Sequence, residues 1–180
     1  DNLISLIVDH REVILFGTQS IEVWYNSGNA TFPIERLQGA FMEMGCAATH
    51  SVAKMDNTVY WLGNDKNGAL GVFRAQGYQP VRISTHAIEK AIDSYTIISD
   101  GVAYCYHQEG HAFYVLTFPS ANRTWVFDAA TQLWHERASF NASNEQQRHR
   151  SNCHAYFNGK NIVGDFENGN IYALELDTYS

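Results

Sequence analysis

The sequence predicts an all-β protein made of four-stranded antiparallel sheets, of the kind that form the blades of a β-propeller. Short apolar and aromatic runs of strand length, turn residues between them, and an internal repeat of about fifty residues lead to this prediction. Phe, Trp and Tyr make up 13% of the 180 residues and charged residues only 17%, which is the composition of a folded domain with a sizeable core.

Strand-length runs follow one another along most of the chain. Each run combines β-branched, apolar and aromatic residues, which suit the pleated surface of a sheet. The runs are Val13–Thr18, Ile21–Tyr25, Thr58–Leu62, Leu70–Ala75, Val102–His107, Phe113–Phe118, Trp125–Asp128, Ile162–Phe166 and Ile171–Leu176.

Turn residues between these runs predict tight hairpins. Asn67-Gly68, Glu109-Gly110 and Asn168-Gly169 each stand between two runs. A two-residue hairpin turn needs positive φ angles, which Gly and Asn adopt most easily.

One segment has helical periodicity. Residues Ala87–Ile92 place Ile88, Ala91 and Ile92 on one side of a helix, and Thr85 stands before them as a candidate N-cap. We expect one short connecting helix.

Four hairpins share one pattern, in which an apolar strand, a polar turn and an apolar–aromatic strand follow each other. Trp24, Phe73, Phe127 and Tyr172 take equivalent places in these hairpins, at spacings of 49, 54 and 45 residues. This period is the length of a four-stranded propeller blade. An ordinary sandwich of two sheets is the alternative fold.

The segment after Phe127 resembles the hairpin between the third and fourth strands of kelch-like blades. By this resemblance Asp128 and Thr131 shape the turn, and Trp134 packs between neighbouring blades.

The repeats predict that residues 1–180 form one β-repeat domain of about three and a half blades, with approximate repeats at 1–40, 45–92, 94–140 and 150–180. Closed propellers have about four to eight blades. We therefore expect a fragment of a larger propeller in a longer chain, or an open array whose ends are covered by something else. Uncovered sheet edges favour association.

The charge balance disfavours nucleic-acid binding. Nineteen acidic residues outnumber twelve Lys and Arg residues, which gives a net charge of −7. Because DNA affinity comes mainly from neutralising phosphates, we expect no direct sequence-specific nucleic-acid binding. The one basic cluster is Arg148, His149 and Arg150, and we interpret it as a solvated loop.

No apolar run is long enough to cross a bilayer. The run Leu3–Val8 is interrupted by Ser5 and stops at Asp9, which is also too short for a signal-peptide core. We expect a soluble protein without membrane contact.

Three cysteines, Cys46, Cys105 and Cys153, lack the spacing of a metal or redox motif. Apolar or small residues flank them, so we expect buried structural thiols in a reducing compartment.

The histidines predict no metal centre. His107 and His111 are four residues apart, a spacing that places two metal ligands on one side of a helix. Glu109-Gly110 between them predicts a hairpin turn rather than a helix, so the spacing does not indicate a metal site. His149 and His154 lie in an expected polar loop beside Cys153, without a second well-spaced pair.

One further segment, Asp65–Gly68, has part of the spacing of a calcium loop but lacks its closing Glu. The sequence therefore predicts no metal ion and no cofactor.

No constellation of residues predicts catalysis. Glu22, Glu43 and Asp100 are carboxylates of the type that propeller glycosidases use in pairs, but nothing in the sequence pairs them. Nucleophile elbows, phosphate-binding loops and dinucleotide fingerprints do not occur. We expect a protein that is not an enzyme and has no catalytic, cofactor-binding or metal-binding residues.

Four elements between Val13 and Thr96 occur in a specific combination. They are the strand pair Phe16-Gly17-x-x-x-Ile21-Glu22, the stretch Gly45-Cys46-Ala47, the hairpin from Gly68 to Phe73, and the connector from Ile83-Ser84-Thr85 to Ile88-Glu89-Lys90 before Ser94-Tyr95-Thr96. This combination resembles the packaged-DNA stabilisation protein (tail accessory factor or head-completion protein) of short-tailed bacteriophages. The resemblance covers about half the chain well and is looser from Val102 to Leu176.

The resemblance implies a structural virion protein without catalytic motifs, made in the cytoplasm of the bacterial host and located in the tail or neck of the virion. Family members are longer than this chain. They form a ring below the portal and its first adaptor, which implies a cyclic homo-oligomer, expected to be six-fold. The implied partners are portal-adaptor and other tail proteins and the tail needle or fibres, and the implied role is retention of packaged DNA.

A carbohydrate-binding or glycan-cleaving propeller domain is the alternative function. A central funnel lined by paired carboxylates would favour it. An apolar protein–protein face would favour the structural role.

Overall fold

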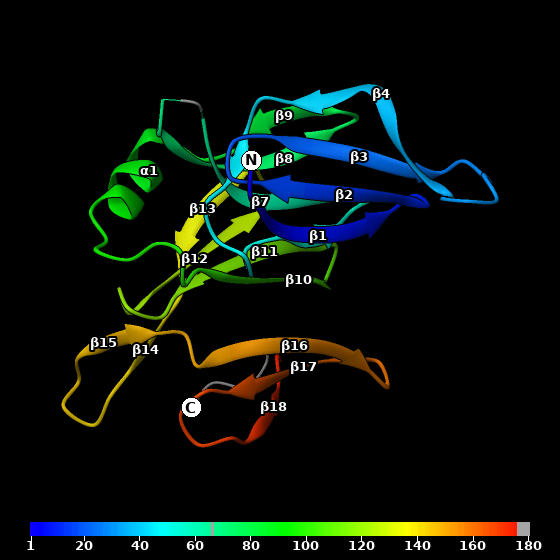
Figure 1. The fold of residues 1–180 in the computed structure, drawn as a ribbon. Helices are drawn as coiled ribbons and strands as arrows, with labels where there is room; N and C mark the ends of the chain where they lie inside the picture. The colour runs from blue at the N-terminus through cyan, green and yellow to red at the C-terminus, as the bar shows by residue number, and fades with distance from the viewer. Residues whose placement is uncertain (66, 176–180) are drawn as a thin grey trace.

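The structure, a computed structural model, describes residues 1–65 and 67–175 (Figure 1). Within these residues the chain forms antiparallel sheets that follow one another in sequence order, together with one short helix, as predicted. Lys66 of the Asp65–Gly68 segment and Leu176 of the last predicted run lie outside the described residues.

The described sheets are meanders, in which consecutive strands pair. The first sheet contains β1 (Leu3–Asp9), β2 (Glu12–Gly17), β3 (Ile21–Asn26) and β4 (Ile34–Met42). In the second, β5 (Gly45–Cys46) and β6 (Ala53–Met55) both pair with β7 (Thr58–Asn64), which is followed by β8 (Leu70–Gln76) and β9 (Gln79–Arg82). The third contains β10 (Val102–Gln108), β11 (His111–Phe118), β12 (Arg123–Asp128) and β13 (Leu133–Glu136). A hairpin of β14 (Ala138–Phe140) and β15 (Gln146–Arg148) precedes the last sheet, which contains β16 (Ser151–Phe157), β17 (Lys160–Asp165) and β18 (Ile171–Ala173).

The four aromatic residues that define the repeat occupy equivalent strands. Trp24, Phe73, Phe127 and Tyr172 lie on β3, β8, β12 and β18, each the third strand along its sheet. The prediction of equivalent positions is confirmed. Phe73 and Phe127 are buried between sheets, whereas Tyr172 on the last sheet is 47% exposed.

Three apolar cores join the sheets in series. Between the first and second sheets, Phe16 packs edge-on against Trp61 with ring centres 5.5 Å apart. Between the second and third, Tyr60 stacks on Tyr114 at 5.5 Å. A smaller core around Tyr106 lies between the third and last sheets. The first and last sheets therefore lie at opposite ends of the array (Figure 1).

Helix α1 spans His86–Asp93, close to the predicted range. Thr85 caps it, because its Oγ1 accepts a hydrogen bond from the Ile88 N–H at 3.4 Å. Ile88 and Ile92 are buried in the core between the second and third sheets. Among the described residues, no helix has the length and apolar character needed to cross a membrane.

The predicted turn chemistry is confirmed at two hairpins. Glu109 and Gly110 both have positive φ, 50° and 82°, and join β10 to β11. At the end of β12, Asp128 accepts hydrogen bonds from the Ala130 N–H at 2.9 Å and from the Thr131 hydroxyl at 2.8 Å.

Trp134 packs between neighbouring sheets, as predicted. Its ring centre lies 5.3 Å from that of Phe127, and its indole N–H donates to the Ile83 carbonyl, which belongs to the connector after the second sheet, at 2.9 Å.

Two expectations were wrong. The segment from His149 to His154 is not a loop, because it contains the start of β16, and His154 stacks on Tyr104 of the third sheet with ring centres 5.6 Å apart. The polar residues of β16 do not indicate a strand in the sequence, and its conformation is determined by backbone pairing with β17.

Cys153 is exposed rather than buried, because it lies on the outward face of the last sheet. Cys46 is buried and Cys105 is partly buried.

Candidate functional site

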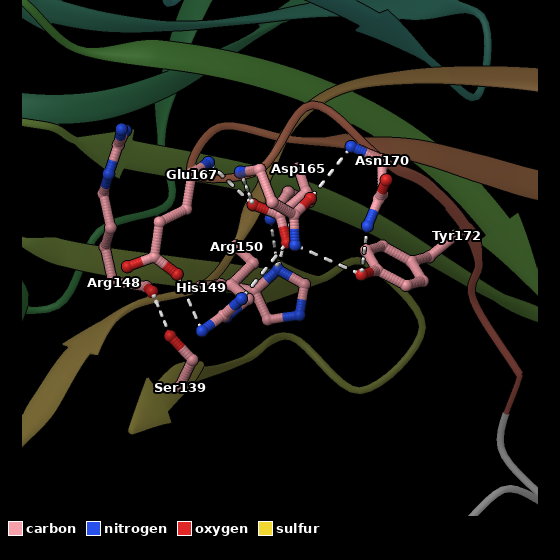
Figure 2. Close-up of polar contacts among 10 residues, drawn as sticks. Ser139, Arg148, His149, Arg150, Asp165, Glu167, Asn170 and Tyr172 are labelled. Atoms are coloured by element: carbon pink, nitrogen blue, oxygen red, sulfur yellow. Dashed lines mark hydrogen bonds and ion pairs between the residues drawn. The ribbon is translucent and has the colours of Figure 1, made fainter. Parts of the chain in front are cut away.

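The basic cluster Arg148, His149 and Arg150 lies where the β14–β15 hairpin meets the last sheet (Figure 2). Arg148 ends β15 and Ser151 begins β16, so the three side chains follow a bend between two strands. The loop that begins at Asp165, at the end of β17, lies against this bend. This bend is the one place where the sequence concentrates positive charge.

Two carboxylates neutralise Arg150. Its Nη2 lies 2.7 Å from Glu167 Oε2 and its Nη1 3.4 Å from Asp165 Oδ2. Burial raises the pKa of Asp165, but the backbone N–H groups of Glu167 and Asn168 and the charge of Arg150 outweigh this and lower the pKa below its ordinary value. Asp165 is therefore ionised at neutral pH, and Arg150 is part of an internal ion network.

His149 is partly buried and neutral at pH 7. Burial, assisted by the positive charge of Arg137 and opposed by Asp165, lowers the pKa of His149 to about 4. Its Nδ1 lies 2.6 Å from the Ser151 hydroxyl, which in turn lies 2.6 Å from the Tyr104 hydroxyl. His149 thus ties the bend to the third sheet and adds no positive charge at pH 7.

Arg148 differs from its two neighbours. Its guanidinium carbon lies 3.6 Å from the centre of the Phe166 ring, and within the described residues no carboxylate forms an ion pair with it. Its Nη1 is sealed from solvent without a hydrogen-bond acceptor. Hydrogen bonds of its backbone with Ser139 and Asn122, at 2.7 and 2.8 Å, hold the main chain in place. In Figure 2 its side chain points away from the Arg150–Asp165 network.

Of the three side chains of the cluster, only Arg148 is charged at neutral pH and has no carboxylate in an ion pair with it among the described residues. Burial lowers the pKa of the Arg148 guanidinium and the charge of Asp100 raises it, but arginine stays protonated in proteins. One uncompensated guanidinium falls far short of the roughly 6–10 phosphate contacts that a typical duplex-binding protein makes.

A cavity of about 550 Å³ lies between the first and second sheets, beside the β1–β2, β6–β7 and β8–β9 turns. Its carboxylates already have partners. Asp9 pairs with Lys54 at 2.5 Å, and Glu12 accepts a hydrogen bond from the Tyr78 hydroxyl at 2.8 Å. Asp56 lies 2.7 Å from a histidine of the third sheet. The carboxylates of this cavity are therefore engaged, whereas Trp61 Nε1 and Arg74 Nε, which belong to residues that also line it, are buried without a hydrogen-bond partner among the described residues.

The histidines considered as metal ligands each have a separate partner. The pairs are His107 with Asp56 at 2.7 Å, His111 with Asp128 at 2.7 Å, and His154 with Asn161 at 3.0 Å. In the part of the chain that the structure describes, no group of three or more His, Cys, Asp and Glu side chains could hold a metal ion.

The three candidate carboxylates lie on different elements. Glu22 on β3 pairs with Arg36 at 3.4 Å. Glu43 follows β4, and Asp100 precedes β10, where it accepts a hydrogen bond from the Ser120 N–H at 2.7 Å. Asp100 Oδ1 is buried and has no partner among the described residues.

The outward face of the first sheet is apolar along β1 and β2 and carries the Glu22–Arg36 ion pair on β3 and β4. Cross-strand pairing aligns Leu6 with Leu15 and Val8 with Val13, and Val13 pairs in turn with Trp24. Cross-strand partners share one face of a sheet, and Leu6 and Val8 are 56% and 58% exposed. The core between the first and second sheets lies on the opposite face.

The outward face of the last sheet is also apolar. Cys153, Gly164 and Ile171 align across β16, β17 and β18, and so do the small and branched residues at positions 155, 162 and 173. Ile171 is 73% exposed, and Phe157 is 71% exposed. In the sequence, the only indication of these two outward faces is the apolar residues of the strands that form them.

Comparison with known families agrees with this architecture. A family model described as bacteriophage P22 Gp10, β-propeller, matches residues 1–179, which is nearly the whole chain. A search of curated proteins finds no match. The chain therefore belongs to the family of phage packaged-DNA stabilisation proteins, which are structural proteins of the β-propeller type.

Proposed function

We propose that this protein is a tail adaptor or plug below the portal of a phage virion, where it helps to retain packaged DNA and docks further tail components. Its partners in this proposal are portal-adaptor and other tail proteins, the tail needle or fibres, and further copies of itself in a six-fold ring. The family match supports a structural virion role, and the finer position is our inference.

The proposal rests on the outward faces of the first and last sheets, at the two ends of the array, which we call the end faces. Inside the array, neighbouring sheets bury faces of the same kind, as Phe16 and Trp61 show. The outward faces that contain Leu6 and Ile171 continue this pattern but are exposed. We infer that each is covered in the assembly by the apolar face of another β-sheet, since exposed sheet surfaces of this kind favour association.

The proposal also explains how an acidic protein could retain DNA. A net charge of −7 and a basic cluster in which Arg150 is neutralised and His149 is uncharged disfavour contact with phosphates. Retention would then come from closing a protein channel, with binding energy from protein–protein burial in a cyclic assembly.

The carbohydrate alternative receives less support. Its chemistry needs two carboxylates free to face a glycosidic bond. Around the cavity between the first and second sheets, Asp9, Glu12 and Asp56 are each engaged by another side chain.

Incorporation into virions tests the proposal. We expect Leu6→Glu and Ile171→Glu to leave the protein folded but to exclude it from purified particles, because each places a charge in an apolar interface. Leu133→Glu is the matched control, since Leu133 is 65% exposed on β13, away from both end faces. Normal incorporation of both end-face variants, measured by mass spectrometry of purified virions, would contradict the proposal.

A further inference from the structure

We propose that Arg148 and Phe166 form a binding pocket for a single carboxylate group. A cavity of about 210 Å³ lies at this place, between the β14–β15 hairpin and the loops that follow β11 and β17. Its lining residues include Asn122, Ser139, Gln147, Arg148, Phe166 and Glu167.

The guanidinium of Arg148 is positioned for such a ligand. It lies over the Phe166 ring at 3.6 Å, which orients its plane, and its backbone is fixed by Ser139 and Asn122. A planar guanidinium binds a carboxylate through two parallel hydrogen bonds. Among the described residues no carboxylate forms an ion pair with Arg148, and its Nη1, which is closed to solvent, has no hydrogen-bond acceptor there.

The surrounding charges select the ligand. Glu167 also lines the cavity, but its Oε2 is held by Arg150 at 2.7 Å. The negative charges of Glu167 and Asp100 disfavour a doubly charged phosphate more than a singly charged carboxylate. A nucleic-acid backbone is excluded as the ligand because it needs several cations, and this cavity offers one unpaired guanidinium.

In the virion, the carboxylate would come from an acidic side chain of a neighbouring protein, and this part of the inference rests on the proposed function. The pocket itself does not rest on the proposed function, because acetate binding can be tested on the isolated chain. Asp100 is the internal competitor, since its buried Oδ1 also has no partner and its charge acts on Arg148.

Acetate titration of the ¹⁵N-labelled chain, followed at the side-chain Nε–H signals of arginine, tests the pocket. We expect a saturable shift at Arg148 with a dissociation constant of about 1–10 mM. Arg148→Gln should weaken binding at least about tenfold, and Arg148→Lys should do so less. Asp100→Asn should tighten binding about two- to fivefold by removing a repulsion. A short peptide with one Glu should bind, and its Gln counterpart should not.

Arg36→Gln is the matched control, because the Arg36 guanidinium also lies over a ring, Phe41 at 5.2 Å, but already holds Glu22 at 3.4 Å. This variant should leave acetate binding at Arg148 unchanged. Preserved backbone spectra show that each variant is folded. Shifts that rise linearly and equally in the natural chain and in Arg148→Gln would overturn the proposal. Acetate binding by Asp100→Asn but not by the natural chain would also overturn it, because Arg148 would then be the internal partner of Asp100.

Discussion

At the scale of single residues, a few side chains join one sheet to the next. Trp134 belongs to the third sheet by sequence but donates its indole hydrogen bond to the connector after the second. His149 performs a similar role between the third and last sheets through Ser151 and Tyr104. The kelch-like pattern predicted the first contact. The second was hidden, because a polar sequence does not reveal which polar side chains become buried.

Replacing Trp134 by Ala should lower the free energy of unfolding by about 2–4 kcal/mol, since a half-buried aromatic ring and one buried hydrogen bond are lost. Leu133→Ala, next to it but 65% exposed, should change it by less than about 0.5 kcal/mol. Urea titration measures both. Equal losses for the two variants would show that Trp134 does not join the sheets.

The partly buried His149 makes stability depend on pH. Its pKa is about 4 in the folded chain, below the ordinary value of 6.5, so the unfolded chain binds more protons between these values. The stabilisation associated with neutral His149 is complete above pH 6.5 and is lost as pH falls towards 4, by at most about 3 kcal/mol. His149→Asn retains an acceptor near Nδ1 without titrating and should flatten the unfolding free energy over this window. An unchanged pH profile in the variant would contradict the assignment.

At the scale of elements, the segments that enter the first, third and last sheets anchor the loop between the second and third strands of the same sheet. Asp1 accepts a hydrogen bond from the Ser20 hydroxyl at 2.6 Å, Asp100 accepts from the Ser120 N–H at 2.7 Å, and Arg150 pairs with Glu167 at 2.7 Å. These anchors occupy corresponding places in the first, third and last sheets. The sequence did not reveal them, because the same role is played by an acidic residue twice and by a basic residue once.

Helix α1 is anchored by its own buried carboxylate. Glu89 is buried, pairs with Arg82 at the end of β9, and accepts a hydrogen bond from the Ser84 hydroxyl at 2.6 Å. Glu89→Ala should lower the free energy of unfolding by about 1–3 kcal/mol, because these donors lose their acceptor. Lys90→Ala, on the exposed side of the same helix, should be nearly neutral. Thermal unfolding of both variants is the measurement, and similar midpoints for the two would contradict this role of Glu89.

At the scale of the whole molecule, hydrophobic pattern and turn chemistry predicted the meander of sheets, the short helix and the equivalence of Trp24, Phe73, Phe127 and Tyr172. Strands such as β4 and β16 were missed, because charged and polar residues interrupt their apolar residues and pairing with a neighbour determines their conformation. The carboxylate pocket could not be predicted, since it depends on which arginine of the basic cluster lacks a carboxylate.

The charge distribution of the whole molecule predicts that it does not grip DNA. Fluorescence anisotropy of labelled duplex DNA at about 150 mM salt should show no binding up to about 10 µM protein, whereas non-specific DNA-binding proteins typically bind in the range of about 1–100 µM. The prediction follows from the net charge of −7 and from the neutralisation of Arg150. Tight binding that weakens steeply with salt would contradict it.

Genome retention by capsids assembled without this protein tests the central proposal most directly. If the protein completes a channel below the portal, such capsids should package DNA and then lose it, as nuclease protection over time would show. Addition of the purified protein should restore retention, and the Leu6→Glu variant, altered on the outward face of the first sheet, should not. Full and lasting retention of the genome in its absence would contradict the account.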